Sequence, residues 1–228
     1  MELSLRTLLG AMQWAGCGEP HLIFAGGAEY VPPAAAGRER RALFDELTEL
    51  GVTVGKELDP EFERWLHVLD RPHTEYYAYA RTGDEQFGVL IAVRGSTTVV
   101  AEHHDKRVWL RSVGERDYPA LLVELLPSVR PAAFTPFSLP ASAYPGSGPE
   151  ARQLDTLLDP PPRGMGHLHT ARRPGGGPRQ QAVAPVSYLD TAAGRVGIEH
   201  TADAHLTVFP GDPTGLAARL AAARSTLD

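Results

Sequence analysis

The segment SYLDTAAGRVGIEH, residues 187–200, gathers an Asp, a Thr, a Gly and an Arg, the residue types that build phosphate cradles and small active sites. Asp190 and Thr191 have side chains that hydrogen-bond the backbone two residues further on, and Gly194 adopts a positive φ easily. A phosphate cradle needs more glycines and a helix N-terminus after them, whereas a strand pattern follows Gly194. The segment therefore predicts a structural hairpin of Asp190, Thr191, Gly194 and Arg195, with Arg195 anchoring the hairpin by hydrogen bonds.

Two histidine pairs are the candidates for metal or hydrolytic chemistry. His103 and His104 are adjacent in a strand pattern, so their rings point to opposite faces and cannot share a metal. His167 and His169 alternate and face the same way, but no Cys or HxxH partner completes a site. A small metal-dependent or hydrolytic enzyme using these histidines is the alternative interpretation.

The single cysteine, Cys17, is the remaining nucleophile, because the chain has no GxSxG elbow. Glu19 and His21 lie near it in sequence, but nothing fixes the three as a relay, so we expect a small buried thiol at a helix end. The preceding WAGC resembles a lipoprotein cleavage motif. Glu2 and Arg6 interrupt the apolar run that such a signal needs, so a lipidated envelope protein is a third, less favoured interpretation.

Composition bounds the possible partners. The chain has 228 residues, 43% hydrophobic and 22% charged, which is typical of a globular protein. Its net charge is −6 and it has no block of Lys or Arg, which argues against nucleic acid or an anionic membrane surface as partner. One cysteine and no apolar stretch of about 20 residues predict a reducing compartment without membrane insertion, hence the cytoplasm. We expect no enzyme activity, no catalytic or metal-binding residues and no cofactor.

The hydrophobic periodicity predicts the elements that hold these residues. Helices are expected after Ser4, over 38–50, after the cap Asp59, over 115–126 and 151–158, and after the cap Asp212. Strands are expected over 21–24, 74–82, 87–95, 97–105, 107–113, 166–173, 181–190, 194–201 and 205–211. The Gly-rich segment RRPGGGPRQQ, residues 172–181, is interpreted as a hairpin loop rather than a cofactor cradle. Trp65 and Trp109 are expected on core faces.

The order of elements repeats along the chain. In both halves, four strand patterns lead into an acidic-Pro turn and an apolar helix. We therefore predict one domain over 1–228, of class α+β, with pseudo-repeat halves 1–131 and 132–228. The two quasi-symmetric halves would share a central antiparallel sheet flanked by helices.

Several segments in this order resemble the EspG family of chaperones for type VII (ESX) secretion in actinobacteria. They are ELTELGV, LDPEFERWLHVLDRP, VLIAVRGSTTVVAEHHDKRVWLRSV, ALLVELLPSVRPA, FSLP, YLDTAAGRVGIE and LTVFPGD. The hairpin YLDTAAGR, followed by a Pro-Gly turn and a final helix, is the most specific of them. The resemblance covers most of the chain.

The resemblance implies a cytosolic chaperone without catalysis. Such a protein binds helical-bundle secretion substrates of the PE/PPE type and keeps them soluble before export. Partner contacts in the family come from the sheet face, the second half's helices and the loop between the first two meander strands. Here that loop is Thr82, Gly83, Asp84, Glu85 and Gln86. The short loop and the room for only one helix over 149–164 depart from the family, so a WXG100-like substrate or another ESX component is an alternative partner.

Overall fold

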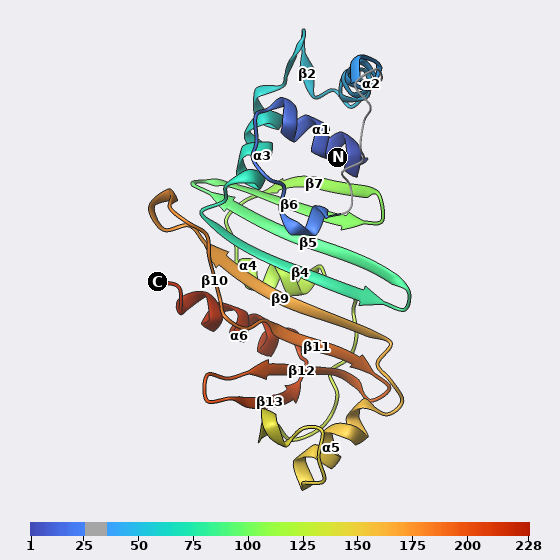
Figure 1. The fold of residues 1–228 in the computed structure, drawn as a ribbon, viewed down its shortest axis with the longest axis vertical. Helices are drawn as coiled ribbons and strands as arrows, with labels where there is room; N and C mark the ends of the chain where they lie inside the picture. Colours follow the sequence, from blue (N-terminus) through green and yellow to red (C-terminus); the bar gives the residue numbers. More distant parts are fainter. Residues whose placement is uncertain (26–35) are drawn as a thin grey trace.

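The computed structural model describes residues 1–25 and 36–228, and Figure 1 shows a wide sheet with helices at both ends and behind it. The helices are α1 Leu5–Trp14, α2 Ala36–Glu49, α3 Pro60–Asp70, α4 Tyr118–Glu124, α5 Pro149–Leu158 and α6 Pro213–Ser225, with 3-10 turns η1 Leu22–Phe24, η2 Ala141–Ala143 and η3 Pro174–Gly176. The predicted α+β class, with a central antiparallel sheet flanked by helices, is confirmed.

Within the described residues, eleven strands form one sheet in the order β1-β7-β6-β5-β4-β9-β11-β12-β13-β8, and β10 pairs with β9. They are β1 Glu2–Ser4, β4 Thr74–Thr82, β5 Glu85–Arg94, β6 Thr97–His104, β7 Arg107–Val113, β8 Phe137–Pro140, β9 Gly164–Arg172, β10 Gln180–Gln181, β11 Val186–Thr191, β12 Gly194–His200 and β13 His205–Pro210. A separate small hairpin joins β2 Thr53–Val54 to β3 Glu57–Leu58.

The two halves of the chain meet at the middle of this sheet. β4 pairs antiparallel with β9, with Tyr77 opposite His169, and each half of the chain supplies the strands on its own side. The division into pseudo-repeat halves 1–131 and 132–228 follows this seam and stays a prediction.

The helices cover the two faces of the sheet unequally. Side chains alternate between faces along each strand, so Tyr77 and Tyr79 of β4 define one face and Tyr76 and Ala78 the other. We name these the α3 face and the α6 face. Helices α1 and α3 pack on the α3 face over β5 to β7, and α5 packs beyond β13. Helices α4 and α6 pack together on the α6 face. Among the described residues, the middle of the α3 face therefore has no helix over it.

Helix α3 illustrates how local sequence sets these elements. Asp59 caps it by accepting hydrogen bonds from the backbone of Glu61 at 2.9 Å and Phe62 at 3.1 Å, and Pro60 occupies its first turn. Phe62 and Leu66 are buried against the sheet, while Trp65 is half-buried at the edge of the same core.

Four expectations about secondary structure and burial were wrong. Residues 21–24 form η1, because His21 caps a short turn by accepting from the Ile23 backbone at 3.2 Å. The helix expected over 115–126 is only α4, because its cap is Asp117. The strand expected over 181–190 is interrupted between β10 and β11, close to Pro185. Trp109 is 38% exposed, since no helix of the described residues covers its side of β7.

Four strands are too short to show a hydrophobic period in the sequence. Strands β1, β8 and the β2–β3 hairpin are four residues long at most, so alternation within each of them is barely defined. β1 and β8 are strands because they pair with β7 and β13, which lie far away in the sequence.

Candidate functional site

The β11–β12 hairpin is held by a buried ion pair. Arg195 donates through Nε to Asp190 Oδ1 at 2.7 Å and through Nη2 to Asp190 Oδ2 at 2.9 Å. The side chains lie near the Tyr188 ring, whose centroid is 4.1 Å from the guanidinium carbon. Arg195 Nη2 also donates to the Pro127 carbonyl at 2.8 Å. With Asp190 7% and Arg195 4% exposed, the pair is well placed to support structure and unsuited to contact a partner.

The chain segment around Pro131 crosses the tip of this hairpin. The backbone N–H of Arg195 donates to Arg130 O at 2.7 Å, and Ala132 N donates back to Arg195 O at 2.9 Å. Gly194 has φ +124°, and a Cβ placed there would lie 2.6 Å from Arg130 O. Thr191 Oγ1 donates to Gly194 O at 2.9 Å. The hairpin therefore joins the connection between the two halves to the sheet.

The β4–β5 hairpin, predicted to contact a partner, lies on the surface. Thr82, Gly83, Asp84, Glu85 and Gln86 are all exposed, and Gly83 has φ +61°. Gly83 N donates to the Arg163 carbonyl at 2.8 Å, which ties the turn to the start of β9. Accessible polar side chains in this position suit a contact loop, and their role in binding stays a prediction.

The first histidine pair is separated, as its spacing predicts. His103 lies on the α3 face, where Nδ1 is 2.6 Å from Ile23 O and Nε2 is 2.6 Å from Asp105 O. His104 points to the α6 face, 3.8 Å from Glu85 Oε2. The two rings share no ligand position.

The second histidine pair shares the α3 face but has separate partners. His167 Nδ1 lies 2.9 Å from Ser187 Oγ, and His169 stacks on Tyr77 with ring centroids 4.8 Å apart. Burial, helped by His167 and Arg179, lowers the pKa of His169 to about 4, so this ring is neutral at neutral pH. The geometry gives each ring a packing or hydrogen-bonding role.

Sequence reasoning missed one convergence of titratable groups. Cys17, His67 and Asp70 offer ligand atoms within 4.8 Å of one another, and this is the one such cluster in the part of the chain that the structure describes. Cys17 Sγ lies 3.8 Å from His67 Nδ1. Burial, together with Asp70 and Glu63, raises the pKa of Cys17 to about 11. The thiol form is therefore favoured, which makes Cys17 a poor nucleophile. The one sequence signal of this cluster is the i, i+3 spacing of His67 and Asp70 on α3.

The middle of the α3 face carries a strip of partly exposed side chains, which we name the open strip. Its members are Tyr79 on β4, Met165, His167 and His169 on β9, and Ser187 and Leu189 on β11. His167 is exposed and the other five are half-buried. The strip combines aromatic, aliphatic and neutral polar groups, a composition that suits protein contact. The β4–β5 hairpin begins at the end of the strip, where Arg81 lies opposite Met165.

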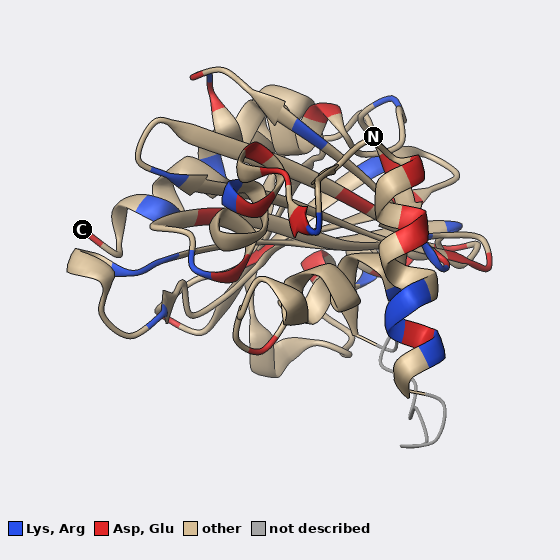
Figure 2. Ribbon diagram, turned by 90° about the horizontal axis from the view of Figure 1, so that it is seen from above, with Lys and Arg blue, Asp and Glu red and all other residues tan. Residues whose placement is uncertain are grey.

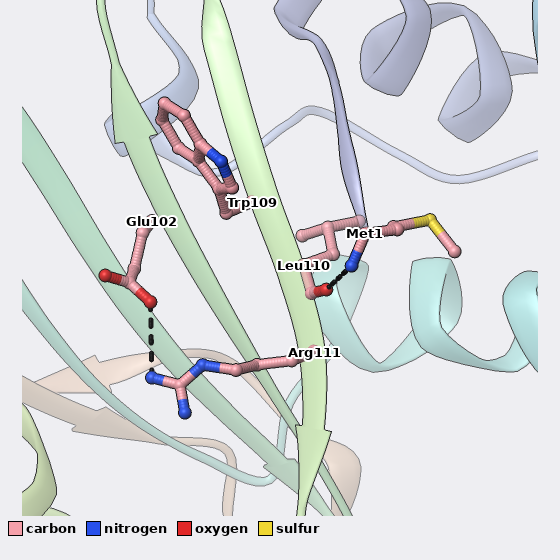
Figure 3. Close-up of a pocket in the computed structure, with 5 residues that line it drawn as sticks. All are labelled: Met1, Glu102, Trp109, Leu110 and Arg111. Carbon is pink, nitrogen blue, oxygen red and sulfur yellow. Dashed lines mark hydrogen bonds and ion pairs between the residues drawn. The ribbon is translucent and has the colours of Figure 1, made fainter. Parts of the chain in front are cut away.

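A second open surface lies on the α6 face of the outer strands. Trp109, Glu102 and Arg111 line a hollow of about 410 Å³, in which Arg111 donates to Glu102 at 3.2 Å (Figure 3). The amino group of Met1 closes one side by donating to Leu110 O at 2.7 Å. Elsewhere charge is interspersed, most clearly along α2 in Figure 2. Within the described residues, no helix combines the length and apolar character that crossing a membrane requires.

The fold defines the chain as an α+β protein built on one wide antiparallel sheet. A sequence model of the EspG family matches residues 4–222, and the chain belongs to that family. The resemblance inferred from sequence is thereby confirmed.

Among solved structures, the chain is similar to the Mycobacterium tuberculosis type VII secretion system chaperone EspG5, which was solved in complex with a PE25–PPE41 dimer. The two share 16% sequence identity and superpose with a TM-score of 0.78, covering 100% of this chain and 96% of EspG5. At that identity the similarity establishes the fold. No curated protein matches the chain.

Proposed function

We propose that this protein is a cytoplasmic chaperone of type VII secretion, which binds helical secretion substrates of the PE/PPE type before export. Membership of the EspG family supports this function, as does the shared fold with a chaperone solved together with a PE25–PPE41 dimer. The single observation that carries the proposal is the family match over residues 4–222.

The open strip is the docking surface that we assign to the substrate. A helical bundle with an apolar tip self-associates unless another surface covers that tip. Leu189 and Met165 offer aliphatic contacts, and the neutral His169 ring brings no charge that would have to be desolvated. Helix layers rise at both ends of the strip, so a rod-like partner would lie between them.

The β4–β5 hairpin is proposed to make the polar rim of this interface. It continues from the end of the open strip, and the exposed carboxylates of Asp84 and Glu85 at its tip are accessible to basic side chains. The region 149–164 holds one helix, α5. The proposed interface therefore includes no pair of helices in this region. A WXG100-like helical hairpin is the alternative substrate.

The protein is proposed to act without catalysis. His103 and His167 have separate partners, and Cys17 is a stabilised thiol. The alternative, an enzyme using the strand histidines, would require these rings to converge on one substrate. Metal-dependent turnover lost on replacing His167 would favour that alternative.

Co-expression with PE/PPE-like and WXG100-like proteins from the same genome tests the proposal. We expect one helical substrate to co-purify and to stay soluble only in the presence of this chain. His167→Glu, which places a charge in the open strip, should weaken binding at least tenfold. A folded chain that retains none of these substrates would refute the chaperone function.

Two further variants locate the docking surface. Ala42→Glu adds the same charge on α2, where the side chain is exposed, and should leave the affinity unchanged. Trp109→Ala removes the exposed aromatic of the second surface. Loss of binding in Trp109→Ala, with normal binding in His167→Glu, would move the interface to the α6 face.

A further inference from the structure

A cluster of arginines surrounds a hollow at the end of the sheet where α3 leads into β4. Arg71, His73, Arg94, Arg173 and Arg179 line a cavity of about 340 Å³, which we name the arginine pocket. Backbone hydrogen bonds hold its walls together. His73 N donates to Val93 O at 2.8 Å, and Arg173 N donates to His73 O at 2.9 Å. The residues thus come from three separate chain segments held in fixed positions.

Only two of the four guanidinium groups have a carboxylate partner. Arg71 lies 3.7 Å from Asp70, and Arg179 pairs with the buried Glu75. Among the residues that the structure describes, Arg94 and Arg173 pair with no carboxylate. Arg94 donates at 3.3 Å to the backbone carbonyl of His67 instead.

Arg173 carries the clearest sign of a missing partner. Its Nη1 atom is buried and, within the described part of the chain, has no hydrogen-bond acceptor. A buried donor on a charged group that lacks an acceptor is destabilising. Arg173 also lines the pocket, so an anion bound there would lie beside its guanidinium group.

The electrostatic setting of the pocket is unusual for this chain. The whole protein has a net charge of −6, yet two arginines that lack a carboxylate partner among the described residues line this one pocket. Arginine stays charged at any physiological pH, so these groups cannot relieve their repulsion by losing a proton. The same field acts on the neighbouring His21, where burial, with help from Arg179 and Arg173, lowers the pKa to about 3.

Arg179 is already fixed in place by the protein. Its Nη2 donates to the Tyr77 hydroxyl at 3.0 Å and its Nη1 donates to Gln181 at 2.8 Å. This arginine therefore forms a preorganised wall, and Arg94 and Arg173 remain available to a ligand.

We propose that the arginine pocket binds a phosphate group, either as the free ion or carried by a small soluble molecule. A phosphate dianion matches the two uncompensated positive charges, and its oxygens accept from several guanidinium forks at once. A carboxylate carries one charge and two oxygens, which a single arginine satisfies. The cavity exceeds the roughly 30 Å³ that a water molecule occupies by a wide margin, leaving room for more than the phosphate alone. This site is independent of the proposed substrate interface.

Titration calorimetry with inorganic phosphate, at constant ionic strength in chloride buffer, tests the proposal on the full chain. We expect saturable binding and a rise in Tm with phosphate concentration. Arg173→Gln and Arg94→Gln should each weaken phosphate binding at least tenfold. The control Arg152→Gln removes an exposed arginine on α5 that does not line the pocket, and this variant should bind phosphate as the wild type does.

The affinities of other anions show which kind of ligand the pocket prefers. Tighter binding of pyrophosphate than of phosphate would assign the pocket to a phosphorylated molecule, and the reverse would assign it to the free ion. Without any phosphate, Arg94→Gln should be at least as stable as the wild type, because it relieves repulsion. Absence of binding at 10 mM phosphate, equal binding by succinate, or equal losses in Arg152→Gln would each overturn the proposal.

Discussion

Two hairpins of this sheet are built from similar turn residues but occupy opposite environments. The β4–β5 turn, with Thr82, Gly83 and Asp84, is exposed throughout, whereas Asp190, Thr191 and Arg195 of the β11–β12 hairpin are buried. Both turns contain a glycine with positive φ, at +61° in Gly83 and +124° in Gly194. Turn chemistry alone therefore does not distinguish a contact loop from a structural one.

The difference arises from chain that is remote in sequence. The segment from Pro127 to Ala132 packs on the second hairpin and accepts from or donates to Arg195. Among the described residues, the turn of the first hairpin has one backbone hydrogen bond to another segment, from Gly83 to Arg163, and Glu85 lies 3.8 Å from His104. A hairpin that connects the two halves should be intolerant of change, and a hairpin that projects from the sheet should tolerate it.

The largest expected effect comes from breaking the buried ion pair. Arg195→Leu leaves the Asp190 carboxylate buried without its partner, which should lower the free energy of unfolding by about 3–5 kcal/mol. Urea unfolding followed by circular dichroism measures this loss. The double variant Asp190→Leu, Arg195→Leu should be more stable than Arg195→Leu alone, because it removes the uncompensated charge. A loss below about 1 kcal/mol in Arg195→Leu would show that the pair is not structural.

The two glycines provide a more direct comparison, with a smaller effect. Gly194→Ala places a methyl group against Arg130 O and Ala132 N at a strained φ, and should cost roughly 3 kcal/mol. Gly83→Ala has no atom within 4 Å of the added methyl group, so only the left-handed backbone opposes it, at about 1 kcal/mol. Thermal unfolding of both variants checks the order. Equal losses would mean that the crossing segment yields without cost.

The sequence predicted the regular parts of the fold better than its long-range contacts. Alternation located β4 and β7 to the residue, and the cap Asp59 located the start of α3. The exposure of Trp109 could not be predicted, because it depends on how far α4 extends over the α6 face, where Trp109 lies. Similarly, turn chemistry predicts a hairpin at Asp190 and Arg195, but it does not predict the bond from Arg195 to Pro127, which joins residues 68 positions apart.

The arginine pocket could not be predicted from the sequence either, because long-range contacts assemble it. Residues 172–181 were interpreted as a hairpin loop, and β9 and β10 do form one. Nothing in that segment predicts that Arg173 lines one pocket with Arg94 and Arg71, which lie about 80 and about 100 residues earlier in the chain. Sites assembled across the sheet seam become visible only when strand order is known.

The smallest effect on stability, and the sharpest functional contrast, is expected at the tip of the first hairpin. Reversing both charges with Asp84→Lys and Glu85→Lys removes only the exposed contact between Glu85 and His104, so stability should change by no more than about 0.5 kcal/mol. If the hairpin forms the rim of the substrate interface, the same variant should alter the affinity for the co-purified substrate at least tenfold.

The matched control is Asp45→Lys with Glu49→Lys on α2, which makes the same change in net charge at exposed positions. Calorimetric titration of both variants separates a local contact from a general electrostatic effect, since long-range attraction would respond to both reversals alike. An unchanged affinity in the hairpin variant would remove Thr82–Gln86 from the interface and leave the open strip as the proposed contact.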